Sequence, residues 1–137
     1  MLKAVFFCSR SKAESEPSRT DWAVISISKW GVEVLQFIPG WHAILRLEFH
    51  DIEQEMPGEP WVLFSEDQAK QVIGYVRSRA SEVTGIMVHC RAGVSRSAAM
   101  AKWIADEFEL PFDHDYSLYN RHVYTLLHRI SKGAIDE

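Results

Sequence analysis

The sequence predicts an α/β fold with a small central, mostly parallel sheet that is flanked by helices in a three-layer-like arrangement. In the second half of the chain, strand-like and helix-like segments alternate, which is the order that builds layered α/β domains. The length of 137 residues, with 47% hydrophobic and 25% charged side chains, suits one domain with one core. No repeat, linker or low-complexity tract divides the sequence. Residues 1–137 are therefore predicted to form a single domain.

The first half of the chain supplies three candidate strands. Residues 2–7 (LKAVFF) and 22–28 (WAVISIS) are rich in aromatic and β-branched side chains, as buried strands are. Residues 43–49 (AILRLEF) alternate apolar and polar side chains and predict a third strand. The polar segment 9–21 contains Pro17, so we expect a loop there, with room for a helical turn.

The second half supplies three candidate helices and one more strand. An acidic loop with two prolines, 50–64, leads to a helix that begins at the N-cap Ser65 and ends near Ser81. A buried strand follows at 85–89, and a second helix is expected at 96–108. A last helix is expected at about 116–131, ending at Gly133. The inward positions of the three helices are Val72, Ile73, Val76, Ala98, Ala101, Ile104, Ala105, Phe108, Leu118, Val123, Leu126, Leu127 and Ile130.

Composition limits the classes of function. A net charge of −4 does not suggest a nucleic-acid partner or an anionic membrane. Two cysteines, Cys8 and Cys90, are too few for a secreted disulfide scaffold and favour a reduced, cytoplasmic setting. The apolar run 4–7 is shorter than the core of a signal peptide, and no stretch reaches the length of a membrane span.

The most informative segment is His89–Ser97 (HCRAGVSRS), which lies between the strand 85–89 and the helix 96–108. A strand–loop–helix unit directs the backbone N–H groups of its loop, and the positive end of its helix, at one spot. That spot is predicted to bind an anion, and Gly93 permits the tight curl. The thiol of Cys90, at the start of the loop, is expected to have a lowered pKa.

The side chains of this segment suit a phosphate. Arg96, six positions after Cys90, has a planar guanidinium group that can donate hydrogen bonds to two phosphate oxygens at once. The hydroxyl of Ser97 can hydrogen-bond the sulfur and help it leave, and His89 can hold Cys90 in place. The predicted phosphate-binding loop consists of Arg91, Ala92, Gly93, Val94, Ser95 and Arg96.

The string HCRAGVSRS resembles the signature of the cysteine-dependent protein tyrosine phosphatases, Cys-x5-Arg followed by Ser or Thr. Its HCxxGxSRS form is similar to the dual-specificity branch. The order LRLEFHD, SEDQA, VHCRAGVSRSAA is similar to that of compact bacterial or phage-type members. The resemblance covers residues 43–130 well and the earlier residues only loosely. It implies a phosphatase domain that works through a cysteinyl-phosphate intermediate.

The resemblance also implies an aspartic acid that protonates the leaving oxygen. Asp51 fits best, because it follows a strand, begins an irregular loop and precedes Cys90 by 39 positions. That spacing is somewhat long, so residues 52–60 would be an insertion. Alternatively, Asp51 merely caps or solvates the strand end. The other candidate acids are Glu53, Glu55, Glu59 and Asp67.

Several further residues have two interpretations. Cys8 is either an apolar filler or a partner that traps oxidised Cys90 as a disulfide. Asn120 resembles a late asparagine of the family that braces the active site, and a helix cap explains it nearly as well. Three basic residues lie early in the chain, Arg10, Lys12 and Arg19. Their side chains are either solvated or close enough to contact a substrate phosphate.

The predicted function is hydrolysis of phosphomonoesters on a phosphorylated protein or peptide, with phosphotyrosine as the first candidate and phosphoserine or phosphothreonine as further ones. No metal or organic cofactor is expected, and the sequence leaves the oligomeric state open. The alternatives are a catalytically silent phosphate-binding module and an RNA 5′-phosphatase on the same loop, the latter disfavoured by the acidic net charge. Phosphoinositide hydrolysis usually requires more basic residues in the loop than Arg91 and Arg96.

Overall fold

The computed structural model, which describes residues 1–29 and 31–133, is built on one sheet of four parallel strands. The strand order across the sheet is β1-β4-β2-β3. The α/β class and the parallel sheet predicted from the sequence are therefore confirmed. The strands are β1 (Ala4–Ser9), β2 (Trp22–Ser28), β3 (Ala43–Glu48) and β4 (Gly85–Cys90).

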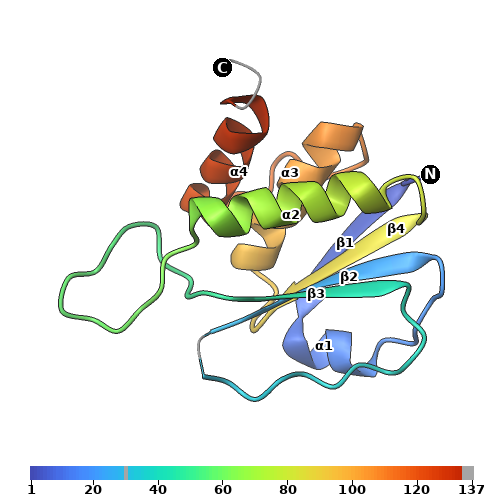
Figure 1. Cartoon of the computed structure of the whole chain (residues 1–137), viewed down its shortest axis with the longest axis horizontal. Helices are drawn as coiled ribbons and strands as arrows, with labels where there is room; N and C mark the ends of the chain where they lie inside the picture. The colour runs from blue at the N-terminus through green and yellow to red at the C-terminus, as the bar shows by residue number, and fades with distance from the viewer. Residues whose placement is uncertain (30, 134–137) are drawn as a thin grey trace.

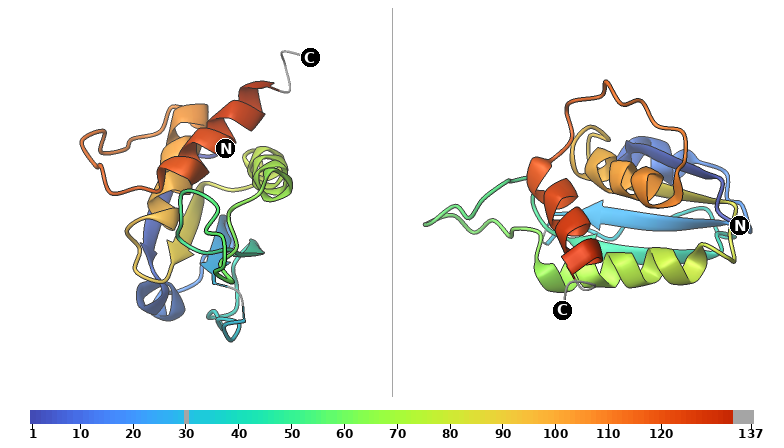
Figure 2. Two further views of the ribbon diagram at one scale, coloured as in Figure 1. Left: turned by 90° about the vertical axis from the view of Figure 1, so that its left-hand side faces the viewer. Right: turned by 90° about the horizontal axis from the view of Figure 1, so that it is seen from above.

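Helices cover the sheet unequally (Figures 1 and 2). Three of them pack together on one face, and a short helix with the extended segment 31–42 covers the other face. The three-layer arrangement predicted from the sequence is present. In chain order the helices are α1 (Arg10–Ser15), α2 (Glu66–Arg79), α3 (Arg96–Phe108) and α4 (Arg121–Gly133).

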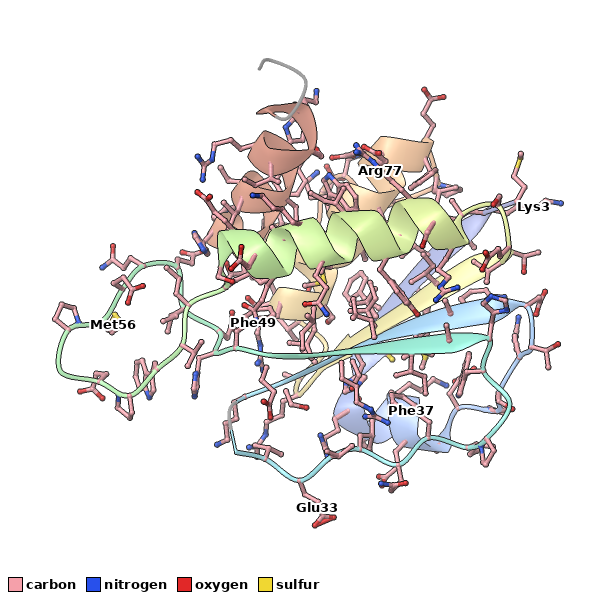
Figure 3. All side chains as sticks on the ribbon, in the orientation of Figure 1. Lys3, Glu33, Phe37, Phe49, Met56 and Arg77 are labelled. Carbon is pink, nitrogen blue, oxygen red and sulfur yellow. The ribbon has the colours of Figure 1, made fainter. Side chains whose placement is uncertain are left out.

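The two faces of the sheet bury separate apolar clusters, because successive side chains of a strand point to opposite faces. In β2, Ile25 and Ile27 belong to the larger cluster under α2, α3 and α4, whereas Val24 belongs to the smaller cluster on the α1 side. Figure 3 shows Phe37 on that second side. β4 lies inside the sheet between β1 and β2, and all six of its residues are buried.

The strand order brings four loops to one place. All four strands are parallel, so their carboxyl ends lie at the same edge of the sheet, where open α/β sheets bind ligands. In the register, Ser9 lies beside Cys90 and Ser26 beside His89. The residues that follow β1, β2 and β3 therefore surround the loop that follows β4.

The acidic loop 50–64 projects from the body of the molecule in both figures, and Met56 lies in its outer part (Figures 2 and 3). Its base is closed by two hydrogen bonds between His50 and Val62. The His50 N–H donates to the Val62 carbonyl at 2.7 Å, and the Val62 N–H donates to His50 Nδ1 at 2.8 Å. The base of the loop, where Asp51 lies, is thereby fixed to the end of β3.

One predicted element boundary is wrong. The last helix was expected from residue 116, but α4 begins at Arg121. The side chain of Asn120 accepts a hydrogen bond from the Val123 N–H at 2.9 Å, which is the geometry of an N-cap, so the helix starts there. Leu118, predicted to point inward, is 63% exposed in the loop before the cap.

The remaining boundaries agree with the sequence to within two residues, and the helical turn allowed for in the loop 9–21 is present as α1. Ser9 caps that helix by accepting from the Lys12 N–H at 3.1 Å, and Pro17 lies beyond its end. Across the described ranges, the helices are all too short or too polar to cross a bilayer.

Candidate active site

The loop after β4 is curled into a nest, meaning a concave turn whose backbone N–H groups converge. Gly93 adopts φ = 73°, a left-handed conformation that favours glycine. A Cβ at this position would overlap the backbone of Cys8 and Ser9, so the loop packs directly on the end of β1. The Arg10 N–H also donates to the Arg91 carbonyl at 3.1 Å. The curl is thus held from outside by the neighbouring strand.

The sulfur of Cys90 lies at the bottom of this nest, with the residue 2% exposed. Ser97 Oγ lies 3.1 Å from Cys90 Sγ. Burial alone raises the pKa of the Cys90 thiol. The Ser97 hydroxyl, the N–H groups of Ser97 and Gly93, and the charge of Arg96 outweigh burial and bring that pKa below its ordinary value. The sequence-based expectation of an acidic thiol agrees with this balance.

Arg96 is buried at the start of α3, with one of its donors unused. Its Nη1 donates to the Phe49 carbonyl at 2.7 Å, which anchors the guanidinium to the residue after β3. Its Nε is buried and finds no hydrogen-bond partner among the described residues. A buried guanidinium N–H without an acceptor is costly. An oxyanion placed in the nest would supply that acceptor.

His89 supports the loop from the α1 side of the sheet. Its Nε2 lies 2.6 Å from Ser26 Oγ, and its Nδ1 lies 3.3 Å from the Cys90 carbonyl oxygen. Burial is the main cause that lowers the pKa of His89 to about 4, and the positive charges of Arg10, Arg46 and Arg96 lower it further. The hydrogen bond to the Cys90 carbonyl acts in the opposite direction and raises this pKa, but it does not outweigh the other effects. The ring is therefore neutral at physiological pH. These charges also give the site positive potential within an acidic protein.

Asp51 lies beside the nest. Its Oδ1 accepts hydrogen bonds from Ser95 Oγ and from Asn120 Nδ2, each at 2.8 Å. Both donors bind Oδ1, and neither of them bonds to the second carboxylate oxygen, Oδ2. The structure thus places the predicted acid next to the predicted phosphate-binding loop although 39 positions separate it from Cys90.

Asn120 performs both of the tasks proposed from the sequence. Its Oδ1 caps α4, while its Nδ2 donates to Asp51 and, at 3.1 Å, to the Ile52 carbonyl. Its own N–H donates to the Ser95 carbonyl at 3.1 Å. One residue, 1% exposed, therefore connects the acidic loop, the nest and the last helix through its side chain and its backbone.

The alternative acids have other contacts. Glu53 Oε2 accepts from the Arg121 N–H at 2.6 Å, at the beginning of α4. Asp67 lies in the first turn of α2, where a negative charge suits the helix dipole. Glu55 and Glu59 are exposed in the projecting part of the loop. Among the five candidates, Asp51 is the one bonded to the nest.

Sequence reasoning missed Tyr116. Its hydroxyl donates to the Val94 carbonyl on the outside of the nest, and its ring packs edge-on against Phe7 at 5.3 Å. Burial, and after it the negative charge of Cys90, raise the pKa of Tyr116, so the hydroxyl stays protonated and donates. The residue had been assigned to a helix, and nothing in its sequence context indicates this contact.

Cys8 is not positioned to pair with Cys90. It lies beside His89 in the register and belongs to the cluster on the α1 side, whereas Cys90 belongs to the cluster on the opposite face. Burial, followed by the charge of Glu16, raises the pKa of the Cys8 thiol to about 11. The apolar-filler interpretation fits this environment. Within residues 1–29 and 31–133, no three His, Cys, Asp or Glu side chains form a group that could hold a metal ion.

This sheet, with an arginine-backed nest after its central strand, has the fold of the cysteine-dependent tyrosine and dual-specificity phosphatases. In particular, the chain is similar to human DUSP28, a dual-specificity phosphatase, with a TM-score of 0.65, 15% sequence identity, and coverage of 96% of this chain and 94% of that one. It is also similar to Tk-PTP in its active form, with a TM-score of 0.48, 14% identity, and coverage of 96% and 81%. The sequence matches no protein-family model and no curated protein. At 15% identity the similarity to DUSP28 establishes the fold alone, and that fold is the one implied by HCRAGVSRS.

Proposed function

We propose that residues 1–137 form a phosphatase domain that hydrolyses phosphomonoesters on phosphorylated proteins or peptides, of the tyrosine or dual-specificity type. The observation that carries this proposal is the nest itself. It combines a thiol of lowered pKa, converging amides, and a buried Arg96 Nε–H that lacks an acceptor within the described residues. A tetrahedral dianion above the sulfur satisfies all of these groups at once.

In the first step, the thiolate of Cys90 attacks phosphorus in line with the leaving oxygen. The S–P bond forms and the P–O bond breaks, while the carboxylic acid of Asp51 gives its proton to the leaving oxygen. The loop amides and Arg96 bind the equatorial oxygens, over which the charge of the transition state is spread. The anchoring of Arg96 to the Phe49 carbonyl fixes the plane of the guanidinium before substrate arrives.

In the second step, water attacks the cysteinyl phosphate. Asp51, now a carboxylate, takes a proton from the water, the O–P bond forms, and the S–P bond breaks to release inorganic phosphate. The Ser97 hydroxyl, 3.1 Å from the sulfur, stabilises the departing thiolate. His89 acts through the loop, as a neutral ring that holds the Cys90 carbonyl and the end of β2 together.

The first test is release of p-nitrophenol from p-nitrophenyl phosphate, compared with Cys90→Ser as the control. Release well above that control is expected. Release no greater than that of Cys90→Ser would contradict the enzyme and leave the silent phosphate-binding module. Faster removal of phosphate from a 5′-phosphorylated RNA than from a phosphotyrosine peptide would favour the RNA phosphatase instead.

The assignment of Asp51 as the acid is tested with Asp51→Asn and its matched control Glu53→Gln. Loss of a general acid costs about 10²–10⁴-fold in rate. The loss in Asp51→Asn should be large for a phenyl phosphate with a poor leaving group and small for one whose leaving group needs no proton. Glu53→Gln should not show this dependence on the leaving group. The reverse pattern would move the acid to Glu53.

A further inference from the structure

We infer that Tyr116 is a positioning residue for oxyanion binding, because its hydroxyl holds the Val94 carbonyl on the outside of the nest and thereby turns the Ser95 N–H inward. This inference rests on the proposed function of the nest and deepens it. It names a residue outside the loop on which the affinity of the loop for a phosphoryl group depends. Tyr116 lies on the outer side of the nest and acts through the backbone of the loop.

The direction of a carbonyl in the nest fixes the direction of the amide that follows it. In a trans peptide the C=O of one residue and the N–H of the next point in opposite directions. The described residues contain no cis peptide bond. The Val94 carbonyl accepts the hydrogen bond of the Tyr116 hydroxyl on the outside of the nest. The N–H of the same peptide, which belongs to Ser95, is therefore directed toward the inside.

Ser95 is held on both sides by one segment of the chain, the loop between α3 and α4. Tyr116 fixes the peptide before Ser95, and the Asn120 N–H fixes the peptide after it by donating to the Ser95 carbonyl at 3.1 Å. The Ser95 N–H itself finds no acceptor within residues 1–29 and 31–133. A donor that is oriented in advance and has no acceptor suits an oxyanion.

Aromatic packing fixes the ring of Tyr116 before any ligand binds. The ring lies 5.3 Å from that of Phe7 in β1, and the ring of Phe112 lies 6.0 Å from the same phenylalanine. The ammonium group of Lys102 in α3 lies over the rings of Phe112 and Tyr119, at 5.8 and 5.5 Å. Both ends of the loop are thus attached to α3, and the hydroxyl reaches the nest from a fixed ring.

The hydroxyl can be removed without unfolding the nest. Val94 is 39% exposed, so water can bind the freed carbonyl in Tyr116→Phe, but water does not hold the peptide in one orientation. The backbone donors that lower the pKa of the Cys90 thiol are those of Ser97 and Gly93, not the one that Tyr116 turns inward. We therefore expect oxyanion affinity to fall while the thiol pKa and the melting temperature stay close to those of the wild type.

The experiment measures by calorimetry the binding of tungstate, a tetrahedral dianion, to the wild type, Tyr116→Phe and Tyr124→Phe. Tyr124→Phe is the matched control, because it removes a hydroxyl of the same kind that donates to Asp106 in α3 instead. Tyr116→Phe should bind tungstate roughly tenfold more weakly, as loss of one hydrogen bond to a charged group predicts. Tyr124→Phe should bind tungstate like the wild type. The same loss should appear in kcat/KM for p-nitrophenyl phosphate.

The absorbance of the Cys90 thiolate at 240 nm, measured against pH, separates a positioning role from a structural one. In Tyr116→Phe the midpoint should match that of the wild type although tungstate binding is weaker. A midpoint shifted to that of free cysteine, together with a lower melting temperature, would indicate a general loosening of the nest and would overturn the inference. Unchanged tungstate affinity in Tyr116→Phe, or an equal loss in Tyr124→Phe, would also overturn it.

Failure of this inference differs from failure of the proposed function. Turnover above the level of Cys90→Ser, combined with tungstate binding that Tyr116→Phe leaves intact, would overturn this inference alone. No turnover above that level would overturn the enzyme, and weaker tungstate binding in Tyr116→Phe would still support the role of the tyrosine. Absence of tungstate binding to the wild type would overturn both.

Discussion

The two cysteines of this chain show how much a thiol depends on its hydrogen-bond donors. Both are buried, and both lie at the carboxyl-end half of neighbouring strands. Burial raises the pKa of Cys8 to about 11. The same burial acts on Cys90, but there the donors of the nest and of Ser97 reverse the direction. The pKa of a thiol at this sheet edge is therefore decided by the loop that follows the strand.

Removal of the Ser97 hydroxyl should raise the pKa of the Cys90 thiol. A hydrogen bond to a charged group contributes about 1.5–3 kcal/mol, which corresponds to a rise of roughly one to two pKa units in Ser97→Ala. Thiolate absorbance at 240 nm, measured against pH with Cys90→Ser as the blank, would show it. A midpoint in the wild type equal to that of free cysteine would contradict the proposed nest chemistry.

His89 should make the protein less stable as the pH falls. Its pKa is lowered from 6.5 to about 4 in the folded chain, so between these values the unfolded chain binds a proton that the folded chain does not. The contribution of neutral His89 to the free energy of unfolding is fully present above about pH 6.5. It declines as the pH falls and stops changing below about pH 4. The loss amounts to about 3 kcal/mol.

Urea unfolding at pH 7, 5.5 and 4.5 measures this loss. His89→Gln keeps a hydrogen-bonding side chain without a titrating ring and should flatten the dependence on pH over this range. A wild-type free energy of unfolding that stays constant from pH 7 to 4.5 would show that His89 is charged when buried.

At the scale of single residues, the sequence identified the side chains that the structure brings together in the nest, but not the groups that anchor them. Cys90, Arg96 and Ser97 follow from a local motif, because one loop sets their geometry. The Phe49 carbonyl that holds Arg96 and the hydroxyl of Tyr116 come from distant segments. Every residue has a backbone carbonyl, so the residue type at position 49 does not indicate that its carbonyl binds Arg96.

Among the elements, the nest depends most strictly on one residue. Gly93 combines a left-handed φ of 73° with direct contact to the backbone of Cys8 and Ser9. An added methyl group therefore costs both backbone strain and displacement of the loop from β1. Gly85, at the start of β4, is also closely packed, because a Cβ there would overlap the ring of Trp22, but its neighbour is a side chain and not the backbone.

Gly93→Ala should abolish turnover and lower stability by about 2–3 kcal/mol, since a strained backbone costs about 1–3 kcal/mol before any overlap is counted. Gly58 also has a positive φ, of 87°, but a Cβ there meets nothing within 4 Å. Gly58→Ala is thus the matched control for strain alone. Equal effects of the two substitutions on activity would contradict the role assigned to the contact with β1.

The elements themselves were largely predictable, for reasons that differ along the chain. The strands and α2 carry strong apolar patterns, and the capping box of Ser65 and Gln68 is present in the structure. The start of α4 was missed because Leu118 continues the apolar spacing of the helix. A helix cap was one of the two sequence-based interpretations of Asn120, but the apolar spacing placed the start of the helix before that residue.

In the molecule as a whole, Asn120 joins parts that are far apart in the sequence. It caps α4, holds Asp51 and Ile52 in the acidic loop, and contacts Ser95 in the nest. The Oδ1 atom of the Asn120 side chain caps α4, whereas its Nδ2 atom donates to Asp51. They can therefore be separated by substitution.

Asn120→Ala removes both functions, and loss of the cap alone costs about 1 kcal/mol. Asn120→Asp keeps the capping oxygen but places a carboxylate beside Asp51, and the like charges should push the loop away from the nest. We expect Asn120→Asp to be the more stable of the two by about 1 kcal/mol, with kcat reduced in both. Thermal or urea unfolding, together with turnover of a phenyl phosphate, measures the two effects separately.

Full activity in Asn120→Asp would show that the contact with Asp51 does not position the acid. Equal stability of the two variants would show that the cap contributes little to the beginning of α4.

The order of the strands has a consequence for synthesis on the ribosome. β1 and β2 are separated in the sheet by β4, so they do not pair with each other. During translation β2 and β3 can associate early, but β1 has no hydrogen-bonded neighbour until residues 85–90 have emerged. Contacts so distant in sequence form slowly. The Cys90 thiol of a nascent chain therefore acquires its lowered pKa only in the step that completes the sheet.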